Sequence, residues 1–461
     1  MHDRRTLLYD KSPPNCSPIY SPHHKSMCMV CCNVTNFKHN HHSVMYTRNM
    51  SNKTLVDLDQ WLAPHKSTIQ AREKYISSKL KMVLGDKTPA EFAMGFLHFG
   101  LHKTDTGWTF REWAPNATQM FLVGDFSDWK EREEFSLSRN KNGEWSINLP
   151  ENSLRHGQKY KLRVYWSGGD GWRLPSYANY VVQDENSVDF SAVVWSPKTP
   201  YNWQYKTPPK PKVPLIYEAH VGMSSQEEKV ASFSEFTAEV LPRIKESGYN
   251  TIQLMAIAEH PYYGSFGYHV SNFFAVSSIF GTPDDFKKLV DAAHGMGLRV
   301  IIDLVHAHAA KNEVEGLGNF AGDPTQYFKP TNHPEWDSRL FDYGKPEVLH
   351  FLASNCRWWL DEYHIDGFRF DGVTSMIYHD HGLGKSFTSY DDYFRDNVDK
   401  DALTYLRLAN ETIHAVRPDA TTIAEEMSGF PGLGASTKDG GLGFDYRLQM
   451  GAPDLWIKTL K

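Results

Sequence analysis

The sequence Ile365-Asp366-Gly367-Phe368-Arg369-Phe370-Asp371-Gly372-Val373 has the character of a short, buried β-strand that ends on a carboxylate. Barrel enzymes place their chemistry at the C-terminal ends of parallel strands. Arg369 precedes Asp371 by two positions, so a strand would put both side chains on one face. The cation would then keep the carboxylate ionised, as a nucleophile requires. The alternative is a buried structural Arg–Asp pair, because ion-pair networks give the same pattern.

Strands and helices alternate on both sides of this stretch. The apolar strand candidates are Leu215–Val221, Asn250–Ile257, Arg299–His306, Ile365–Val373 and Ala420–Met427. The helical candidates between them are Phe233–Ser247, Asp284–Gly295, Lys345–His364 and Asp401–Val416. Such alternation predicts parallel β/α architecture with both faces of the sheet covered. A sixth unit is expected to start at Phe444-Asp445-Tyr446-Arg447.

The first two hundred residues show a different pattern of predicted secondary structure. Residues 50–94 contain an amphipathic helical pattern, with Ile69, Ile76, Leu80 and Val83 on one face. Residues 95–196 read as short strands separated by turns, with Asn142-Gly143 as a hairpin turn, and predict a β-sandwich. Residues 197–214 are rich in proline and predict a stiff linker to a barrel domain at 215–461.

Residues 1–49 form a divergent extension that we expect to be disordered, or to lie upstream of a true start at Met50. A zinc site is the alternative, with candidate ligands Cys28, Cys31, Cys32, His39, His41 and His42. Their spacing matches no standard zinc finger. The segment also lacks the apolar core of a secretory signal.

Composition excludes several classes of function. The net charge of -6 argues against nucleic acid as a partner, and no apolar run approaches the roughly 20 residues of a membrane span. The chain has 13 Trp and 23 Tyr, whose flat rings suit sugar faces. Four of the five cysteines lie in the first 32 residues and suggest no disulfide framework, which predicts a reducing, cytoplasmic location.

Acidic and imidazole groups recur where the predicted strands end, at Asp303, His306, His308, Arg369, Asp371, Glu425 and Glu426. In a barrel these ends converge on one face. Two facing carboxylates, without a metal cluster or a phosphate loop, favour glycosidic chemistry by double displacement. Capping or ion-paired carboxylates are the alternative reading.

Several long motifs then point to one family. In the sandwich region they are Glu112-Trp113-Ala114-Pro115 and Gly124-Asp125-Phe126-Ser127-Asp128-Trp129. In the barrel region they are 216–222, 265–270, 303–308, 367–376 and 423–429. From about residue 55 onward the sequence resembles the eukaryotic glycogen (starch) branching enzymes of the α-amylase superfamily. Two departures are Ala219, where Ser is usual, and Glu426, where Asp is usual.

The resemblance implies a role for each matching residue. Asp371 would be the nucleophile and Glu425 the acid/base, with Arg369 positioning the nucleophile. His308 would hydrogen-bond the sugar, Tyr268 would stack beneath it, and Asp303 would be a structural partner of Arg369.

The resemblance also implies the partner of the chain. We expect glycogen or another α-glucan as substrate, a monomer, and no cofactor, metal, nucleic acid or membrane. In the sandwich, Trp113, Trp129 and Trp145 are candidate glucan contacts, and core packing is the alternative for each, most of all for Trp113.

One motif of the family is missing. A His-Asp pair at the end of the seventh strand is expected, and the sequence stops at Lys461 inside the helix after the sixth; His379-Asp380 is no substitute. The expected fold is therefore an incomplete (β/α)8 barrel, and the chain alone is expected to be inactive and poorly stable. Two other readings remain open: a hydrolase of the same superfamily, and a glucan-binding remnant without catalysis.

Overall fold

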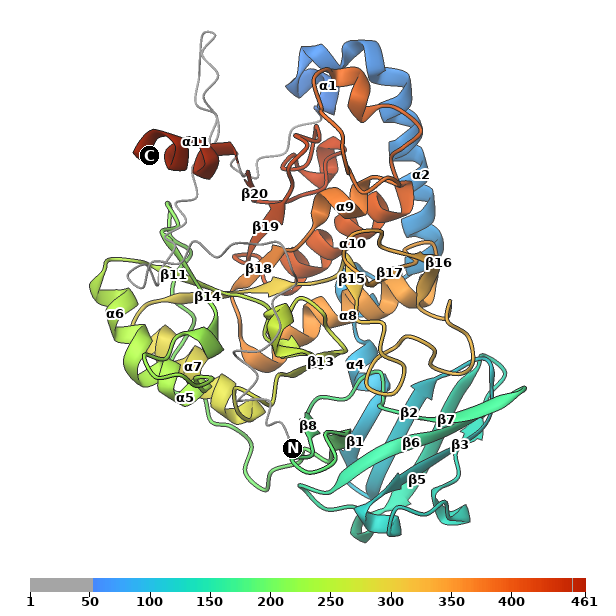
Figure 1. The fold of residues 1–461 in the computed structure, drawn as a ribbon. Helices are drawn as coiled ribbons and strands as arrows, with labels where there is room; N and C mark the ends of the chain where they lie inside the picture. The colour runs from blue at the N-terminus through green and yellow to red at the C-terminus, as the bar shows by residue number, and fades with distance from the viewer. Residues whose placement is uncertain (1–52, 450) are drawn as a thin grey trace. The chain divides into compact units, whose positions relative to one another are not determined.

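The computed structural model describes residues 53–449 and 451–461, which form two compact units (Figure 1). The first contains residues 94–342 and 358–365, and the second contains residues 53–93, 343–357 and 366–461. The expectations for residues 1–49, including the zinc alternative, lie outside the described residues.

The first unit begins with the predicted β-sandwich. One antiparallel sheet has the order β1-β2-β5-β4, and the other has the order β3-β6-β9-β8 with β7 paired to β6. The strands are β1 (Gly100–Thr104), β2 (Gly107–Trp113), β3 (Ala117–Gly124), β4 (Ser138–Arg139), β5 (Glu144–Pro150), β6 (Lys159–Trp166), β7 (Gly169–Arg173), β8 (Val181–Gln183) and β9 (Phe190–Val193). Gly143 turns the chain between β4 and β5 at a φ of 79°, and a Cβ there would lie 2.7 Å from Pro115 Cα, so the expected hairpin turn requires glycine.

The same unit continues into the first three barrel strands. β10 (Ile216–Ala219), β11 (Thr251–Leu254) and β14 (Arg299–Leu304) pair in parallel. α7 (Pro283–Gly295) starts as expected with proline in its first turn. The helix predicted at 233–247 is instead divided into α5 (Phe233–Glu235), a π-helical turn η6 (Phe236–Val240) and α6 (Leu241–Glu246). Pro242 explains the division, because it cannot donate the hydrogen bond that a regular helix requires.

Two small antiparallel sheets follow barrel strands in this unit, and neither was expected. β12 (Ala258–Glu259) pairs with β13 (Asn272–Val276), while β15 (His308–Ala309), β17 (Arg339–Phe341) and β16 (Phe328–Asn332) form a three-stranded sheet. Tyr268 lies in the connection between β12 and β13, and His308 is the first residue of β15.

The proline-rich stretch 197–214 contains no helix or strand, yet it is fastened to α7. The buried carboxylate of Asp291 accepts hydrogen bonds from Tyr201 Oη (3.0 Å), Gln204 N (2.9 Å) and Tyr205 N (2.9 Å). The stretch therefore lies along the helix at these three residues.

The second unit holds three more parallel strands, β18 (Gly367–Phe370), β19 (Thr421–Glu425) and β20 (Tyr446–Leu448). The strand predicted at 365–373 is shorter at both ends. Gly372 has a φ of 63° and begins α9 (Val373–Ile377), so Asp371 lies in the turn where the strand becomes a helix. α8 (Pro346–Tyr363) and α10 (Lys400–Val416) match the predicted helices, and α8 contributes residues to both units.

The N-terminal helical segment also belongs to the second unit. It comprises α1 (Leu55–Leu58), the 3-10 helix η1 (Gln60–His65), α2 (Lys66–Leu84) and α3 (Pro89–Phe92). α2 and α3 pack against α10, and Arg407 binds Glu73 through two hydrogen bonds of 2.7 and 2.6 Å. Ile76 and Leu80 face the interior, as the predicted pattern requires.

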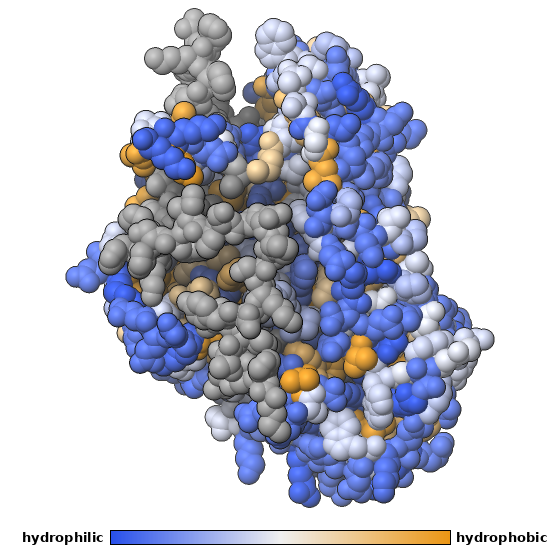
Figure 2. Space-filling model, in the orientation of Figure 1, coloured by the Kyte–Doolittle hydropathy of each residue, from blue (hydrophilic) through white to orange (hydrophobic). Residues whose placement is uncertain are grey.

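Together these strands and helices confirm the expected fold class, a β-sandwich module followed by six strands of an incomplete (β/α)8 barrel. α11 (Gly451–Leu460) exposes Leu455, Trp456, Ile457 and Leu460. Figure 2 shows orange, hydrophobic atoms beside blue ones where this helix lies. In the described ranges we find no helix that combines the length and the hydropathy needed to cross a bilayer.

Candidate active site

A guanidinium group and two carboxyl groups meet at the ends of β18 and β19. Arg369 Nη1 contacts Asp371 Oδ1 at 2.8 Å, and Arg369 Nη2 contacts Glu425 Oε1 at 3.0 Å. The backbone N–H of Gly372 donates to Glu425 Oε2 at 2.9 Å. We call Arg369, Asp371 and Glu425 the carboxylate trio, and one cation holds both of its acidic groups.

The two carboxyl groups of the trio influence each other's protonation. Burial raises the pKa of Glu425; Arg369 opposes this, and the negative charge of Asp371 raises it further. Burial also raises the pKa of Asp371, while Arg369 and a hydrogen bond from Glu425 act to lower it. The pair therefore retains a proton to a higher pH than an isolated carboxyl group would.

Gly367 explains why the trio can form. Its φ is 147°, and a Cβ there would lie 1.9 Å from Thr421 O on the neighbouring strand. Only glycine lets β18 approach β19 this closely, and that approach brings the ends of the two strands, with Asp371 and Glu425, together.

A second cluster lies in the first unit, on the strands β10, β11 and β14 and at Tyr268, before β13. Tyr268 Oη donates to Asp303 Oδ2 at 2.6 Å, and Gln253 Nε2 donates to Asp303 Oδ1 at 2.9 Å and to Glu218 Oε1 at 2.9 Å. Gln253 is a polar residue in a buried strand that the sequence reasoning missed; its position at the centre of an apolar run could have been the signal. The expected pairing of Asp303 with Arg369 stays a prediction, since the two residues belong to different units.

His308 joins this second cluster through the backbone. Its Nε2 lies 2.7 Å from Tyr268 O, a carbonyl that only accepts, so Nε2 carries the proton. Burial lowers the pKa of His308 to about 4, so the ring is neutral at pH 7 and Nδ1 is left as an acceptor. Within the described residues Nδ1 has no hydrogen-bond partner. Trp336 was not foreseen; its ring lies 5.0 Å from the His308 ring and stacks on His333 at 3.9 Å.

Comparison with known proteins shows what this chain is similar to. Residues 98–178 match carbohydrate-binding module 48 (isoamylase N-terminal domain), and residues 237–316 match the alpha amylase catalytic domain. A 1,4-alpha-glucan-branching enzyme of Yarrowia lipolytica is 47% identical over 428 residues, covering 87% of this chain and 62% of the relative. Over most of its length this chain is therefore similar to 1,4-alpha-glucan-branching enzymes.

Other branching enzymes match to a similar degree. That of Solanum tuberosum is 47% identical, covering 88% of this chain and 49% of the relative, and that of Equus caballus is 46% identical, covering 88% and 60%. The chain thus spans about half to three fifths of the length of these relatives.

Solved structures agree on the fold. A putative alpha amylase from Salmonella typhimurium aligns with a TM-score of 0.54 at 22% identity, covering 71% of this chain and 49% of that one. A pullulanase from Bacillus acidopullulyticus aligns with a TM-score of 0.56 at 20% identity, covering 71% and 41%.

Within the matched module the three candidate tryptophans have different surroundings. Trp145 is only 4% exposed and donates from Nε1 to Ala114 O at 2.9 Å, so its ring is part of the sandwich core and offers no face to a sugar. Trp113 is half-buried with its ring edge-on to Tyr327. Trp129 is 39% exposed and adopts a φ of 57°, so it stays a candidate glucan contact.

Glu426, the departure from the family pattern, organises the loop after β19. Its fully buried carboxylate accepts from the backbone N–H groups of Ser428 (2.7 Å), Gly429 (2.9 Å) and Phe430 (3.0 Å), and from the Ser428 hydroxyl. It also lies 3.7 Å from Arg447 Nη1. The residue next to Glu425 is therefore structural, and its longer side chain fits that purpose.

The described residues contain no group of three or more His, Cys, Asp or Glu side chains arranged to hold a metal ion. His379 and Asp380 follow α9, outside the carboxylate trio, and His379 Nδ1 lies 3.8 Å from Asp399.

Proposed function

We propose that the native protein carrying this chain is a 1,4-α-glucan branching enzyme, which cuts an α-1,4 link and transfers the released chain to a 6-hydroxyl. The observation that carries the proposal is the carboxylate trio, in which one buried guanidinium holds Asp371 and Glu425 at neighbouring strand ends. Retaining glycosidases need two carboxyl groups close together, whereas inverting ones leave room for a water between them. Two groups on one cation are suited to the retaining reaction.

The proposed reaction has two displacement steps. Asp371 attacks the anomeric carbon while Glu425 gives its proton to the departing 4-oxygen, which leaves a covalent glycosyl-aspartate and an ionised Glu425. Glu425 then removes the proton from the 6-hydroxyl of an acceptor chain, whose oxygen displaces Asp371. Two inversions restore the α configuration, and the trio returns to its starting protonation.

We propose that the second cluster binds the sugar. Neutral His308 has Nδ1 available to accept from a sugar hydroxyl, and the Tyr268 ring is held by the hydrogen bond of its hydroxyl to Asp303. Replacing Tyr268 with Ala should raise KM by about five-fold, since an aromatic contact with a ligand contributes on the order of 1 kcal/mol.

We also propose that the protein acts in the cytoplasm as a monomer with an α-glucan as its partner. The cysteine content is that of a reducing compartment, and the buried thiol of Cys356 is unpaired among the described residues. Light scattering of the purified protein and fractionation of source cells would test these two points.

The experiment that tests the function is digestion of amylose with the native protein. Branching lowers the iodine colour without creating reducing ends, whereas a hydrolase lowers the colour and creates them in proportion. The Asp371→Asn variant should lose the activity and keep its fold, and a parent protein that binds glucan but changes neither signal would show a non-catalytic glucan-binding protein.

A further inference from the structure

The N-terminal helical segment reaches the loop that follows the acid/base candidate. We propose that Arg72 on α2 is a positioning residue, which holds the loop 426–430 and through it Glu425 in the geometry for proton transfer. The inference rests on the proposed function, because it assigns Arg72 a role in that reaction.

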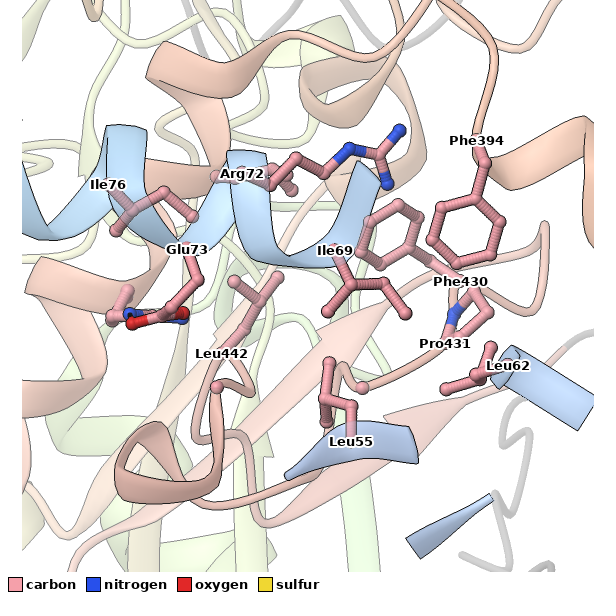
Figure 3. A pocket seen from close by; sticks show the side chains of 14 residues that line it. Leu55, Leu62, Ile69, Arg72, Glu73, Ile76, Phe394, Phe430, Pro431 and Leu442 are labelled. Carbon is pink, nitrogen blue, oxygen red and sulfur yellow. Dashed lines mark hydrogen bonds and ion pairs between the residues drawn. The ribbon is translucent and has the colours of Figure 1, made fainter. Parts of the chain in front are cut away.

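Arg72 is buried, with 8% of its surface exposed, and its guanidinium contacts two segments of the chain. Its Nη2 donates to Tyr393 O at 2.7 Å, at the end of the 3-10 helix η8 (Tyr390–Tyr393). Its guanidinium carbon lies 5.0 Å from the centre of the Phe394 ring and 5.9 Å from that of Phe430. Figure 3 shows the side chain extending from α2 toward these two rings. One guanidinium thus contacts both η8 and the loop after β19.

Tyr393 connects Arg72 to the loop a second time. Its hydroxyl donates to Ser428 O at 2.8 Å, and the same residue's carbonyl accepts from Arg72. Ser428 is in turn held by Glu426, the residue that directly follows Glu425. An unbroken series of contacts therefore leads from the surface helix α2 to the backbone of the acid/base candidate.

Apolar packing alone does not fix this region. A cavity of about 40 Å³ lies between α2, η1 and the loop 430–442, lined by Leu55, Leu62, Ile69, Ile76, Leu403, Phe430, Pro431 and Leu442 among others (Figure 3). Side chains that border a void lose the contacts that would hold them in place. The contacts of Arg72 therefore act together with the hydrogen bonds that Glu426 and Tyr393 make to the loop in selecting one position of Phe430.

Other contacts tie η8 to the same helical segment. Tyr390 Oη donates to Asp59 Oδ2 at 2.7 Å, and the rings of His65 and Phe394 stack at 4.3 Å. These anchor η8 to η1 without touching the loop after β19. Arg72 differs from them because it contacts the loop itself.

The test compares variants of the full native protein in steady-state branching of amylose. Arg72→Met keeps an apolar side chain and removes the hydrogen-bond donors and the charge. We expect kcat to fall about ten-fold while KM stays within about two-fold of the parent value. The reason is that a small misplacement of a catalytic group slows the chemical step. Arg72→Lys should recover part of kcat, since a lysine retains the charge and one donor but not the planar group over two rings. Lys74→Met removes a charge from the exposed face of the same helix and should match the parent.

Two further variants separate positioning from stability. Ile76→Ala removes apolar packing of α2 and leaves Arg72 in the sequence. If this variant and Arg72→Met lose equal thermal stability and show an equal fall in kcat, the inference is overturned. Tyr393→Phe removes only the hydroxyl bound to Ser428 O and should lower kcat about three-fold, so it gives the answer even where Arg72→Met does not fold. A folded Arg72→Met or Tyr393→Phe protein with parental kcat would overturn the inference. A parent protein without branching activity would instead overturn the proposed function.

Discussion

The buried carboxyl group of Glu112 in the sandwich should make the stability of the protein depend on pH. Glu112 is 0% exposed, and burial raises its pKa from 4.5 to about 7. Three donors oppose the shift: Ser176 N at 2.8 Å, Ser176 Oγ at 2.6 Å and Trp113 N at 2.9 Å. Desolvation prevails, because hydrogen bonds from neutral donors do not replace the hydration that a carboxylate loses.

The sign and size of the effect follow from linkage. Between pH 4.5 and about 7 the native state keeps a proton on Glu112 that the unfolded chain has released, so the free energy of unfolding falls as the pH rises through this window. The pKa difference of 7 − 4.5 = 2.5 corresponds to about 3 kcal/mol, at 1.36 kcal/mol per unit. Above pH 7 the loss is complete and the contribution no longer changes.

Glu112→Gln tests this prediction, because glutamine resembles the protonated carboxyl group and does not titrate. Denaturant unfolding of parent and variant at pH 5 and pH 8, followed by tryptophan fluorescence, gives the four free energies required. From pH 5 to pH 8, the difference between the unfolding free energies of variant and parent should change by about 3 kcal/mol in favour of the variant. Glu185→Gln, at an exposed position, supplies the matched control. Equal pH slopes for parent and Glu112→Gln would refute the reasoning.

Three further changes probe the trio, the strand approach and the helix docking. Glu425→Gln should lower kcat on amylose by about 10³-fold. It should still give a burst of fluoride release from an α-maltosyl fluoride donor, because fluoride leaves without a proton. Loss of the fluoride burst together with the amylose activity would argue against an acid/base role. Gly367→Ala should cost at least about 4 kcal/mol, because its Cβ meets Thr421 O at 1.9 Å, and a thermal midpoint equal to the parent's would contradict this. Arg407→Met should lower the free energy of unfolding by about 2 kcal/mol, since it removes the two bonds to the half-exposed Glu73, and Lys74→Met in the same assay should have no effect.

The pattern of neighbouring residues was sufficient to predict which charged side chains lie at the end of β18. Arg369 and Asp371 lie two apart in an apolar run, and strand periodicity places them together as the structure has them. The alternation of strands and helices likewise predicted the parallel strand pairs, because two strands joined by a crossover helix pair in parallel.

What the sequence did not predict depends on residues far apart. Gln253 joins Glu218 and Asp303, which are 35 and 50 positions away, and no local pattern indicates such a contact. The burial of Trp145 was equally hidden, since a tryptophan in an alternating strand can face either the core or the solvent. The π-turn at 236–240 was also not predicted, because apolar periodicity does not distinguish a regular α-helix from one that contains a single wider turn.

The carboxylate trio suggests why a single cation can serve a nucleophile and an acid together. With both carboxyl groups ionised the three groups would carry a net negative charge in a largely buried place; with one proton bound they are neutral, which burial favours. The proton belongs to the pair, because burial raises the pKa of both Asp371 and Glu425. Asp371, nearer to Arg369 at 2.8 Å, is then the group that is left anionic. In the proposed mechanism the first displacement step requires this neutral state, with the proton on Glu425 and the charge on Asp371.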